Sequence, residues 1–251
     1  ESVTVPVGAV DGESGGTAYA CLGARILIFA KAPVPGRVKT RLIPVLGAEG
    51  AAALHESLVA DTLARVTAAR LAPVELWCGP DDDKDSFLRS CSVRFEVPLH
   101  HQQGKDLGER MRDALEAAPT CSSSALIVGS DCPELGPAPI RAALRLLEER
   151  VCEAVFGTVE DGGYGLVGTR RAGDALFHDI DWGSNRVMTQ TRERLREAGW
   201  RWAEIAVGWD VDRPEDLARL RRSWRDLQPQ RRTRTFVRPS SHQRGSSPDA
   251  F

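Results

Sequence analysis

The run Ala125-Leu-Ile-Val-Gly129 is the most strand-like stretch of the chain, and Ser130-Asp131-Cys132-Pro133 follows it directly. Continuous apolar runs of this length are typical of strands that are buried on both faces of a parallel sheet. We therefore expect this strand near the centre of the sheet. Open α/β sheets bind ligands at the carboxyl ends of their strands. Asp131 thus either lies in a ligand-binding crevice or caps the turn that follows the strand.

Further apolar runs alternate with amphipathic segments on both sides of this strand. The sequence predicts other strands at residues 25–30, 74–78, 93–97, 153–159, 166–168 and 202–207. It predicts helices at residues 47–69, near 87, and at 109–118, 137–150, 184–199 and 214–227. Strands that alternate with helices favour an α/β fold with a mostly parallel sheet and helices on both of its faces.

The length of 251 residues suits one α/β domain, which we expect at residues 25–227. Residues 1–24 are rich in glycine, serine and valine and show no clear period, so they are expected to form a loosely ordered extension. They also lack the pattern of a signal peptide. Residues 228–251 contain few residues that form cores, and we expect a disordered basic tail there.

The composition disfavours several classes of function. A net charge of -2 gives no general reason to expect binding to nucleic acid or to a membrane surface. No run of apolar residues is long enough to predict a membrane span. The six cysteines form no C-x-x-C pair, so we expect free thiols in a reducing, cytoplasmic setting. The histidines form no H-x-x-x-H or H-E-x-x-H pattern, which disfavours zinc hydrolysis.

A basic loop, Phe29-Ala-Lys-Ala-Pro-Val-Pro-Gly-Arg-Val-Lys-Thr-Arg41, follows the first predicted strand. Its prolines and glycine predict an irregular turn, because proline fixes φ and glycine permits unusual backbone angles. Arg37, Lys39 and Arg41 would share one face if the segment is extended. Three cations on one face suit a diphosphate or triphosphate. The alternative is a solvated basic loop.

Two acidic motifs follow later strands. Glu160-Asp161-Gly162-Gly163-Tyr164 predicts a hairpin turn, in which Asp161 either stays local or faces the pocket as a general base or a hydroxyl-binding acid. Asp210-Val-Asp212-Arg-Pro-Glu215 precedes the last helix. Asp212 either caps that helix together with Glu215 or, with Asp210, adds to a site for a divalent cation at Asp131.

Two lesser segments complete the candidate site. Gln103-Gly104-Lys105-Asp106-Leu107-Gly108 is a glycine-bearing loop before a helix, and it suits contact with a base or a ribose. Trp182 follows Asp181, close to the start of the helix expected at 184–199. Its indole ring either belongs to the core or forms a platform for a sugar.

Five segments, in order along the chain, resemble the DUF2064 family. They are Lys31-Ala-Pro-Val-Pro-Gly-Arg-Val-Lys-Thr-Arg-Leu42, Gly104-Lys-Asp-Leu-Gly-Glu-Arg-Met111, Gly129-Ser-Asp-Cys-Pro133, Glu160-Asp-Gly-Gly-Tyr164 and Asp210-Val-Asp-Arg-Pro-Glu-Asp-Leu217. Members of this family are identified as GT-A-type glycosyltransferases, also called radical-SAM/selenodomain-associated transferases, of the nucleotide-diphospho-sugar transferase superfamily. The resemblance runs from about residue 25 to 220 and implies a GT-A fold with a Rossmann-like half for the nucleotide.

The resemblance also implies roles for individual residues. An acid at the end of a central GT-A strand holds Mg²⁺ or Mn²⁺ on the diphosphate. Asp131 is in that place, but its motif lacks the second acid of D-x-D, which Asp210 or Asp212 would supply. The residues implied for nucleotide and phosphate binding are Lys31, Arg37, Lys39, Arg41, Asp106 and Gly108. Those implied for catalysis are Asp161 and Asp131, and those for the acceptor side are Glu160, Gly162, Gly163, Tyr164 and Trp182.

The expected function is metal-dependent transfer of a sugar from a nucleotide diphosphosugar to a small-molecule acceptor. Lys39-Thr-Arg-Leu42 is also similar to Lys-Ser-Arg-Leu in the guanylyltransferases of deazaflavin-cofactor biosynthesis. The alternative is therefore a guanylyl- or cytidylyltransferase-like reaction, in which an NTP and a phosphorylated small molecule release pyrophosphate. A second alternative is a non-catalytic nucleotide-binding partner of another enzyme. The oligomeric state stays open.

Overall fold

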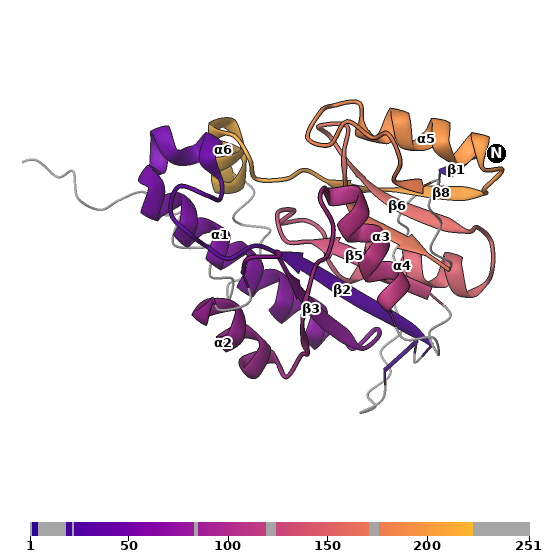
Figure 1. The fold of residues 1–251 in the computed structure, drawn as a ribbon, viewed down its shortest axis with the longest axis horizontal. Helices are drawn as coiled ribbons and strands as arrows, with labels where there is room; N and C mark the ends of the chain where they lie inside the picture. Colours follow the sequence, from indigo (N-terminus) through magenta and orange to yellow (C-terminus); the bar gives the residue numbers. More distant parts are fainter. Residues whose placement is uncertain are drawn as a thin grey trace, which may run out of the picture.

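A twisted sheet runs through the centre of the computed structural model, which describes the backbone of residues 2–4 and all of residues 19–21, 23–82, 85–118, 124–170 and 176–222. Within that part of the chain the sheet has eight strands in the order β1-β8-β6-β7-β5-β2-β3-β4 (Figure 1). The strands are β1 (Ser2–Thr4), β2 (Ala24–Ala30), β3 (Val74–Cys78), β4 (Leu99–His101), β5 (Ser124–Gly129), β6 (Ala154–Val159), β7 (Tyr164–Thr169) and β8 (Trp202–Gly208).

The direction of the strands confirms the α/β prediction. Strand β7 is antiparallel to β5 and β6, and every other pair in the described sheet is parallel. Strand β5 pairs with β2 on one side and β7 on the other, so the apolar run 124–129 is internal to the sheet. From β2 the chain moves outward to β3 and β4, and it then returns to the other side of β2 as β5. This reversal creates the crevice at which open α/β sheets bind ligands.

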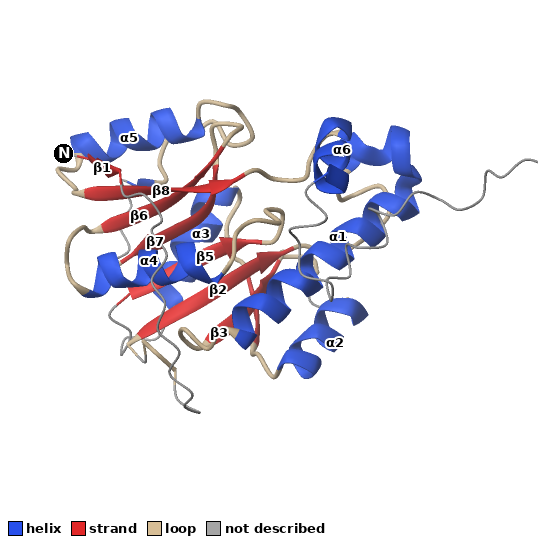
Figure 2. Cartoon of the chain, turned by 180° about the vertical axis from the view of Figure 1, so that it is seen from behind, coloured by secondary structure: helices blue, strands red, loops and turns tan. Residues whose placement is uncertain are grey.

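Helices cover both faces of the sheet (Figures 1 and 2). The described α-helices are α1 (Ile43–Ala68), α2 (Ser86–Phe95), α3 (Leu107–Ala117), α4 (Pro137–Glu148), α5 (Val187–Glu197) and α6 (Pro214–Arg222). Ile26 and Ile28 of β2 pack in one hydrophobic cluster with residues of α1, α2 and α4. Leu27 faces the opposite cluster, which contains residues of α3 and α5. The alternation of side chains along β2 therefore supplies both layers of the core.

A third cluster joins the start of α1 to α6, which lie side by side in both views (Figures 1 and 2). It contains Leu54 and Leu58 of α1 together with Trp209, Leu217 and Leu220. Helix α1 is bent at Gly47, whose φ of 72° is not helical. This packing brings the end of β8 and the basic loop to the same end of the molecule.

One helix, Thr40–Ala68, is long and apolar enough to cross a membrane by length and composition alone. A core helix can meet the same criterion. Here Val59 and Leu63 are buried against the sheet, while Leu54 and Leu58 are buried against α6 and its preceding loop. The helix is thus packed as a core helix on two sides, and it gives no clear sign of a membrane span.

The predicted strand at residues 93–97 is wrong. Residues 93–95 continue α2, and the strand begins later, at Leu99. The Asp85 carboxylate caps the start of α2 by accepting a hydrogen bond from the backbone nitrogen of Leu88 at 2.9 Å. Leu88 and Cys91 then bury one face of the helix, whereas Val93 is 80% exposed. Helical spacing of the buried residues therefore outweighs the strand preference of the valines.

Two other local predictions need revision. Two further predictions concern residues that the structure does not describe. The extension at residues 1–24 includes a short strand, Ser2–Thr4, which pairs in parallel with β8. The basic loop is not extended, because Lys39 has a left-handed backbone and Thr40–Leu42 forms a 3-10 turn. The five described cysteines are free thiols, as predicted. Cys121 and the predicted tail at 228–251 lie outside the described residues.

Candidate active site

A cleft of about 580 Å³ opens at the carboxyl ends of β2 and β5. The loop after β2, the loop after β5, the β6–β7 hairpin and the segment after β8 all reach it. Its charged lining residues are Lys31, Arg37, Lys39, Arg41, Arg110, Asp131, Asp161, Asp210 and Asp212. A second cavity of about 170 Å³ shares Lys31, Arg37 and Arg110 with the cleft and extends to the loop at residues 79–82. Cations and carboxylates from distant segments therefore meet in one place.

Backbone hydrogen bonds hold these segments against one another. The Val211 nitrogen donates to the Asp131 carbonyl at 3.0 Å, which joins the segment after β8 to the end of β5. The Glu160 nitrogen donates to the Gly208 carbonyl at 3.2 Å. The hairpin, the Ser-Asp-Cys-Pro turn and the Asp-Val-Asp segment are thus positioned by main-chain contacts, which do not depend on their side chains.

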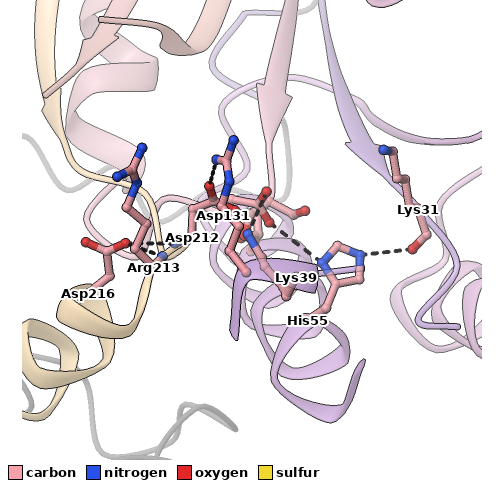
Figure 3. Close-up of polar contacts among 10 residues, drawn as sticks. Lys31, Lys39, His55, Asp131, Asp212, Arg213 and Asp216 are labelled. Carbon is pink, nitrogen blue, oxygen red and sulfur yellow. Dashed lines mark hydrogen bonds and ion pairs between the residues drawn. The ribbon is translucent and has the colours of Figure 1, made fainter. Parts of the chain in front are cut away.

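Lys39 is the most constrained residue of the cleft. Its side chain is only 4% exposed, and its ammonium lies 2.9 Å from Oδ2 of Asp131 (Figure 3). Its backbone is left-handed, with φ of 47°, a conformation that costs free energy for a residue other than glycine. A buried cation held by strained backbone against a carboxylate at a strand end points to a ligand-binding role.

Asp131 is held between Lys39 and His55 (Figure 3). Burial alone would raise the pKa of Asp131, but the Lys39 ammonium and His55 outweigh it, so the pKa lies well below the ordinary value. Nδ1 of His55 lies 3.7 Å from Oδ1 of Asp131, and Nε2 donates to the Lys31 carbonyl at 3.1 Å. The Asp131 side chain is still 45% exposed. Oδ1 is buried, so the exposed part of the carboxylate lies on the Oδ2 side, where the Lys39 ammonium also contacts it.

Asp212 forms an ion pair with Arg41 at the rim of the cleft (Figure 3). The turn before α6 is closed by Asp216, whose Oδ2 accepts from the backbone nitrogens of Asp212 at 3.0 Å and Arg213 at 2.6 Å. The predicted capping box between Asp212 and Glu215 is therefore replaced by a contact to Asp216. Asp212 is free of that capping role, and its carboxylate neutralises Arg41.

Asp210 lies in the most negative part of the cleft. Burial, the charge of Asp161 and the charge of Asp131 raise the pKa of Asp210 to about 6, and Lys39 offsets only part of this effect. Among the described residues no ion-pair partner of Asp210 occurs. Asp161 contacts its own turn, where Oδ1 accepts from the Gly163 nitrogen at 2.8 Å. The Asp-Gly turn is thus a hairpin, and Asp161 also lines the cleft.

Carboxylates of the cleft could contribute oxygens to a hard divalent cation only if a bound ligand completed its shell. The described residues contain no group of three or more His, Cys, Asp or Glu side chains that could hold a metal ion by themselves. Mg²⁺ commonly takes one or two carboxylates and completes its shell with phosphate oxygens and water. Asp210, with its raised pKa, and the open side of Asp131 offer carboxylate oxygens of that kind.

Three of the predicted acceptor-side residues, Glu160, Gly162 and Trp182, do not line the cleft. Glu160 points to α6, where both of its oxygens pair with the Arg219 guanidinium, one of them at 2.7 Å. Gly162 packs instead against the segment that precedes α5, where an added Cβ would lie 2.3 Å from the Asn185 carbonyl oxygen. Gly163 and Tyr164 do line the cleft. Burial raises the pKa of the Tyr164 hydroxyl, so this phenol stays neutral and is a poor base.

Asp106, Gly108 and Trp182 form a structural unit beside the cleft. The Asp106 carboxylate caps α3 by accepting from the Glu109 nitrogen at 2.8 Å. Gly108 is packed under Trp182, so that a side chain at this position would come within 2.8 Å of the indole ring. None of the three lines the 580 Å³ cleft. The structure therefore places Asp106 and Gly108 in a supporting position, away from the cations of the basic loop.

Three residues of the cleft escaped the sequence analysis. His55 belongs to α1 and reaches Asp131, which is 76 residues away, so no spacing rule could have linked them. Gln102 follows β4, and its amide donates to the Trp77 carbonyl at 2.9 Å. Arg110 lies one turn after Leu107 on α3, and both line the cleft. Helical spacing within the segment 104–111 could have signalled Arg110.

Known proteins share this fold. A candidate nucleotide-diphospho-sugar transferase from Desulfovibrio desulfuricans G20 is 29% identical and superposes with a TM-score of 0.76 over 86% of this chain and 94% of its own. A cytidylyltransferase from Leptospira borgpetersenii serovar Hardjo-bovis is 14% identical, with a TM-score of 0.53 over 81% of this chain and 87% of its own. Glucosyl-3-phosphoglycerate synthase from Mycobacterium tuberculosis is 12% identical, with a TM-score of 0.50 over 89% and 84%.

These likenesses confirm the expected fold of nucleotide-diphospho-sugar transferases. At 14% and 12% identity, the second and third show the fold alone. No curated protein matches the sequence. Residues 62–184 match the family described as "Uncharacterized protein conserved in bacteria (DUF2064)". The match includes three of the motifs that carry the resemblance. Over this segment the chain is similar to the DUF2064 family.

Proposed function

We propose that this protein is a metal-dependent glycosyltransferase, which moves a sugar from a nucleotide diphosphosugar to a small-molecule acceptor. The observation that carries this proposal is the meeting of cations and carboxylates in one cleft at the carboxyl edge of the sheet. The likeness to a candidate nucleotide-diphospho-sugar transferase, at 29% identity over most of both chains, supports it further. The described residues of the cleft offer distinct groups for the phosphates, the cation and the acceptor.

The cationic end of the cleft would bind the diphosphate. Lys31 and Arg37 have no ion-pair partner among the described residues, so their charges are available to phosphate oxygens. Lys39 is already oriented by Asp131, and a fixed cation loses little entropy when it binds an anion. Arg37 can pair with two phosphate oxygens at once, whereas each lysine acts as a point charge. The adjoining 170 Å³ cavity would take part of the nucleoside.

Asp210 and the open side of Asp131 would hold Mg²⁺ or Mn²⁺. Such an ion neutralises the charge that develops on the leaving diphosphate. Asp161 lines the cleft and would accept the proton of the acceptor hydroxyl. The acceptor oxygen forms a bond to the anomeric carbon, the bond from that carbon to the diphosphate oxygen breaks, and its electron pair leaves with the diphosphate.

Nucleotidyl transfer is the second candidate, and one observation favours it. Five cationic side chains line the cleft, which is enough charge for a triphosphate. In this reaction a phosphorylated small molecule would attack the α-phosphate of an NTP, and pyrophosphate would leave. The Arg and Lys residues that we assign to the diphosphate would then hold the β- and γ-phosphates of the NTP.

A panel of UDP-sugars, GDP-sugars, GTP and CTP, each with and without Mn²⁺, tests these alternatives. We expect thermal stabilisation by a nucleotide diphosphosugar and slow Mn²⁺-dependent release of nucleoside diphosphate, with no pyrophosphate from any NTP. Release of pyrophosphate would replace the first proposal by the second. Stabilisation by a nucleotide without any turnover, even with varied acceptors, would favour a non-catalytic nucleotide-binding protein.

Asp161→Asn and Glu160→Gln form a matched pair for the proposed base. The two carboxylates are adjacent in sequence, but only Asp161 lines the cleft. We expect the first substitution to lower kcat by about two to four orders of magnitude, the range that a positioned base contributes. The second should leave kcat within about twofold, as is usual for surface changes away from a site. Equal losses from both variants would contradict the assignment of Asp161.

A further inference from the structure

An apolar pocket of about 220 Å³ adjoins the cleft. Phe29, Leu107, Asp161 and Tyr164 line both cavities, so the two share a wall. The other side chains of the pocket come from α3, β5, β7 and the segment that leads into α5. They include Met111, Ile127, Leu166, Val167, Trp182 and Val187.

The lining of this pocket differs in charge from that of the cleft. Among the described residues that line it, Asp161 is the one charged residue and none is a lysine or an arginine. Leu107 is 42% exposed, which makes it one of the few large apolar side chains left open to solvent among the described residues. An exposed leucine at the rim of an apolar cavity gains free energy when a ligand covers it.

The walls of the pocket are packed against one another. Gly129, Gly163 and Gly165 line it with bare backbone, which allows a ligand to approach closely. The rings of Tyr164 and Trp182 meet edge to face, with centroids 6.4 Å apart. Trp182 also rests on Gly108, where no larger residue fits. The cavity is thus formed before any ligand arrives, which reduces the entropy cost of binding.

We propose that this pocket is the acceptor site, and that it takes a hydroxylated acceptor whose body is an aromatic or similarly flat apolar ring. This inference rests on the proposed sugar transfer and names its acceptor class. A cavity of about 150 Å³ can hold benzene, so 220 Å³ leaves room for a substituted ring or two fused rings. The hydroxyl would meet Asp161, which lies on the wall that the pocket shares with the cleft.

The same features disfavour other acceptors at this position. A phosphorylated acceptor would bring a second anion to a pocket whose one charged side chain is a carboxylate. A sugar would bury several hydroxyl groups against Leu, Val and Met side chains, which cannot form hydrogen bonds, and burial of an unpaired hydroxyl group is unfavourable. The ring's oxygen then forms a bond to the anomeric carbon, while the bond from that carbon to the diphosphate oxygen breaks. Its electron pair leaves with the nucleoside diphosphate, and the hydroxyl proton passes to Asp161.

Direct titration without any nucleotide tests the pocket independently of turnover. We expect 2-naphthol to bind with a measurable Kd by calorimetry, and D-glucose and glycerol 3-phosphate to bind at least tenfold more weakly or not at all. Leu107→Asp should weaken the binding of 2-naphthol by about tenfold, which corresponds to about 1.4 kcal/mol. Leu107→Met should retain it, since it keeps an apolar side chain of similar volume.

Val93→Asp is the matched control. Val93 is an exposed apolar residue on α2, far from both cavities in sequence, and it lines neither of them. Its substitution should leave the Kd of 2-naphthol within about twofold, as is usual for surface changes. Equal effects of Leu107→Asp and Val93→Asp, or stronger binding of glycerol 3-phosphate than of 2-naphthol, would overturn the inference.

Turnover separates this inference from the proposed function. If 2-naphthol binds and Leu107→Asp weakens it, but no nucleotide sugar transfers its sugar to a hydroxylated ring, the ligand class of the pocket stands and the transfer fails. If sugar is transferred to D-glucose or glycerol 3-phosphate while 2-naphthol does not bind, the transfer stands and the aromatic acceptor is wrong.

Discussion

The two ends of the binding region recognise ligands by different physics. The cationic end gathers Lys31, Arg37, Lys39 and Arg41 from one loop and opposes them with carboxylates from three others. Among the described residues, the apolar end has one charge, Asp161, and is otherwise lined mainly by rings, aliphatic side chains and glycines. Charges act over several ångströms and tolerate small changes in position, whereas an apolar pocket depends on contact. The cationic end suits the phosphate groups that different nucleotides share. The apolar end suits the acceptor, whose recognition must be specific.

Of the changes that separate the two ends, Lys39→Met should have the largest effect and should confine it to the cationic end. The substitution removes a buried cation and leaves Asp131 without its ammonium partner. We expect turnover to fall by about two to three orders of magnitude, as when one charge-stabilising donor is lost from an active site. Calorimetry should show weak nucleotide binding but unchanged binding of 2-naphthol. Lys105→Met is the control, because Lys105 does not line the cleft.

A change in salt concentration should have the next largest effect, and it should change ligand affinity at the cationic end only. Raising NaCl from 50 to 500 mM shortens the screening length, so the Kd of the nucleotide should rise by about tenfold. The Kd of 2-naphthol should change by less than about twofold, because contact between apolar surfaces is not screened. Parallel salt dependence for both ligands, measured by calorimetry in the same buffers, would remove the distinction between the two ends.

Asp210→Asn should stabilise the protein in the absence of divalent cations. Asp210 is partly buried beside Asp161 and Asp131, which raises its pKa to about 6 and shows that its charge is unfavourable there. Replacing it with an amide should raise Tm by roughly 2–4 °C, the shift expected for about 1 kcal/mol in a chain of this size. The same variant should lose the stabilisation by Mn²⁺ and nucleotide. If the variant has a lower Tm than the unsubstituted protein in EDTA, the negative charge of Asp210 does not destabilise the fold.

Glu160→Gln should have the smallest effect. Its carboxylate pairs with Arg219 on the surface, and exposed ion pairs of this kind add little to stability. We expect unchanged KM values for donor and acceptor and a shift in Tm of less than about 2 °C. A marked rise in the acceptor KM would show that Glu160 contributes to acceptor binding, as its sequence motif predicted.

Local patterns predicted most of the fold. The continuous apolar runs at residues 25–30, 74–78 and 125–129 all form internal strands, because burial on both faces leaves a signal that does not depend on the partners. The prediction of a strand at residues 93–97 was wrong for the opposite reason. That segment is short and half exposed, so the cap at Asp85 and the packing of Leu88 and Cys91 decide its structure.

The candidate site was predictable in part. The sequence indicated Lys39, Asp131, Asp161 and Asp210 as candidate site residues. The structure brings all four to one cleft. The sequence could not indicate His55, which is a lone histidine on a helix until the fold sets it 3.7 Å from Asp131. It also could not tell Glu160 from Asp161, since adjacent residues of a turn point in different directions and only one of them faces the cleft.

The sequence by itself determined which chemical groups follow which strands, because apolar runs, glycines and charges are local properties of the chain. It thereby determined the α/β class, the order of the motifs and the likeness of residues 62–184 to the DUF2064 family. The tertiary structure alone decided which charges are paired. Arg41 is neutralised by Asp212 and Glu160 by Arg219, while Asp210 stays among like charges. It also decided that an apolar pocket adjoins the charged cleft. Pairing and cavity shape depend on contacts between residues far apart in sequence, and no local pattern records those distances.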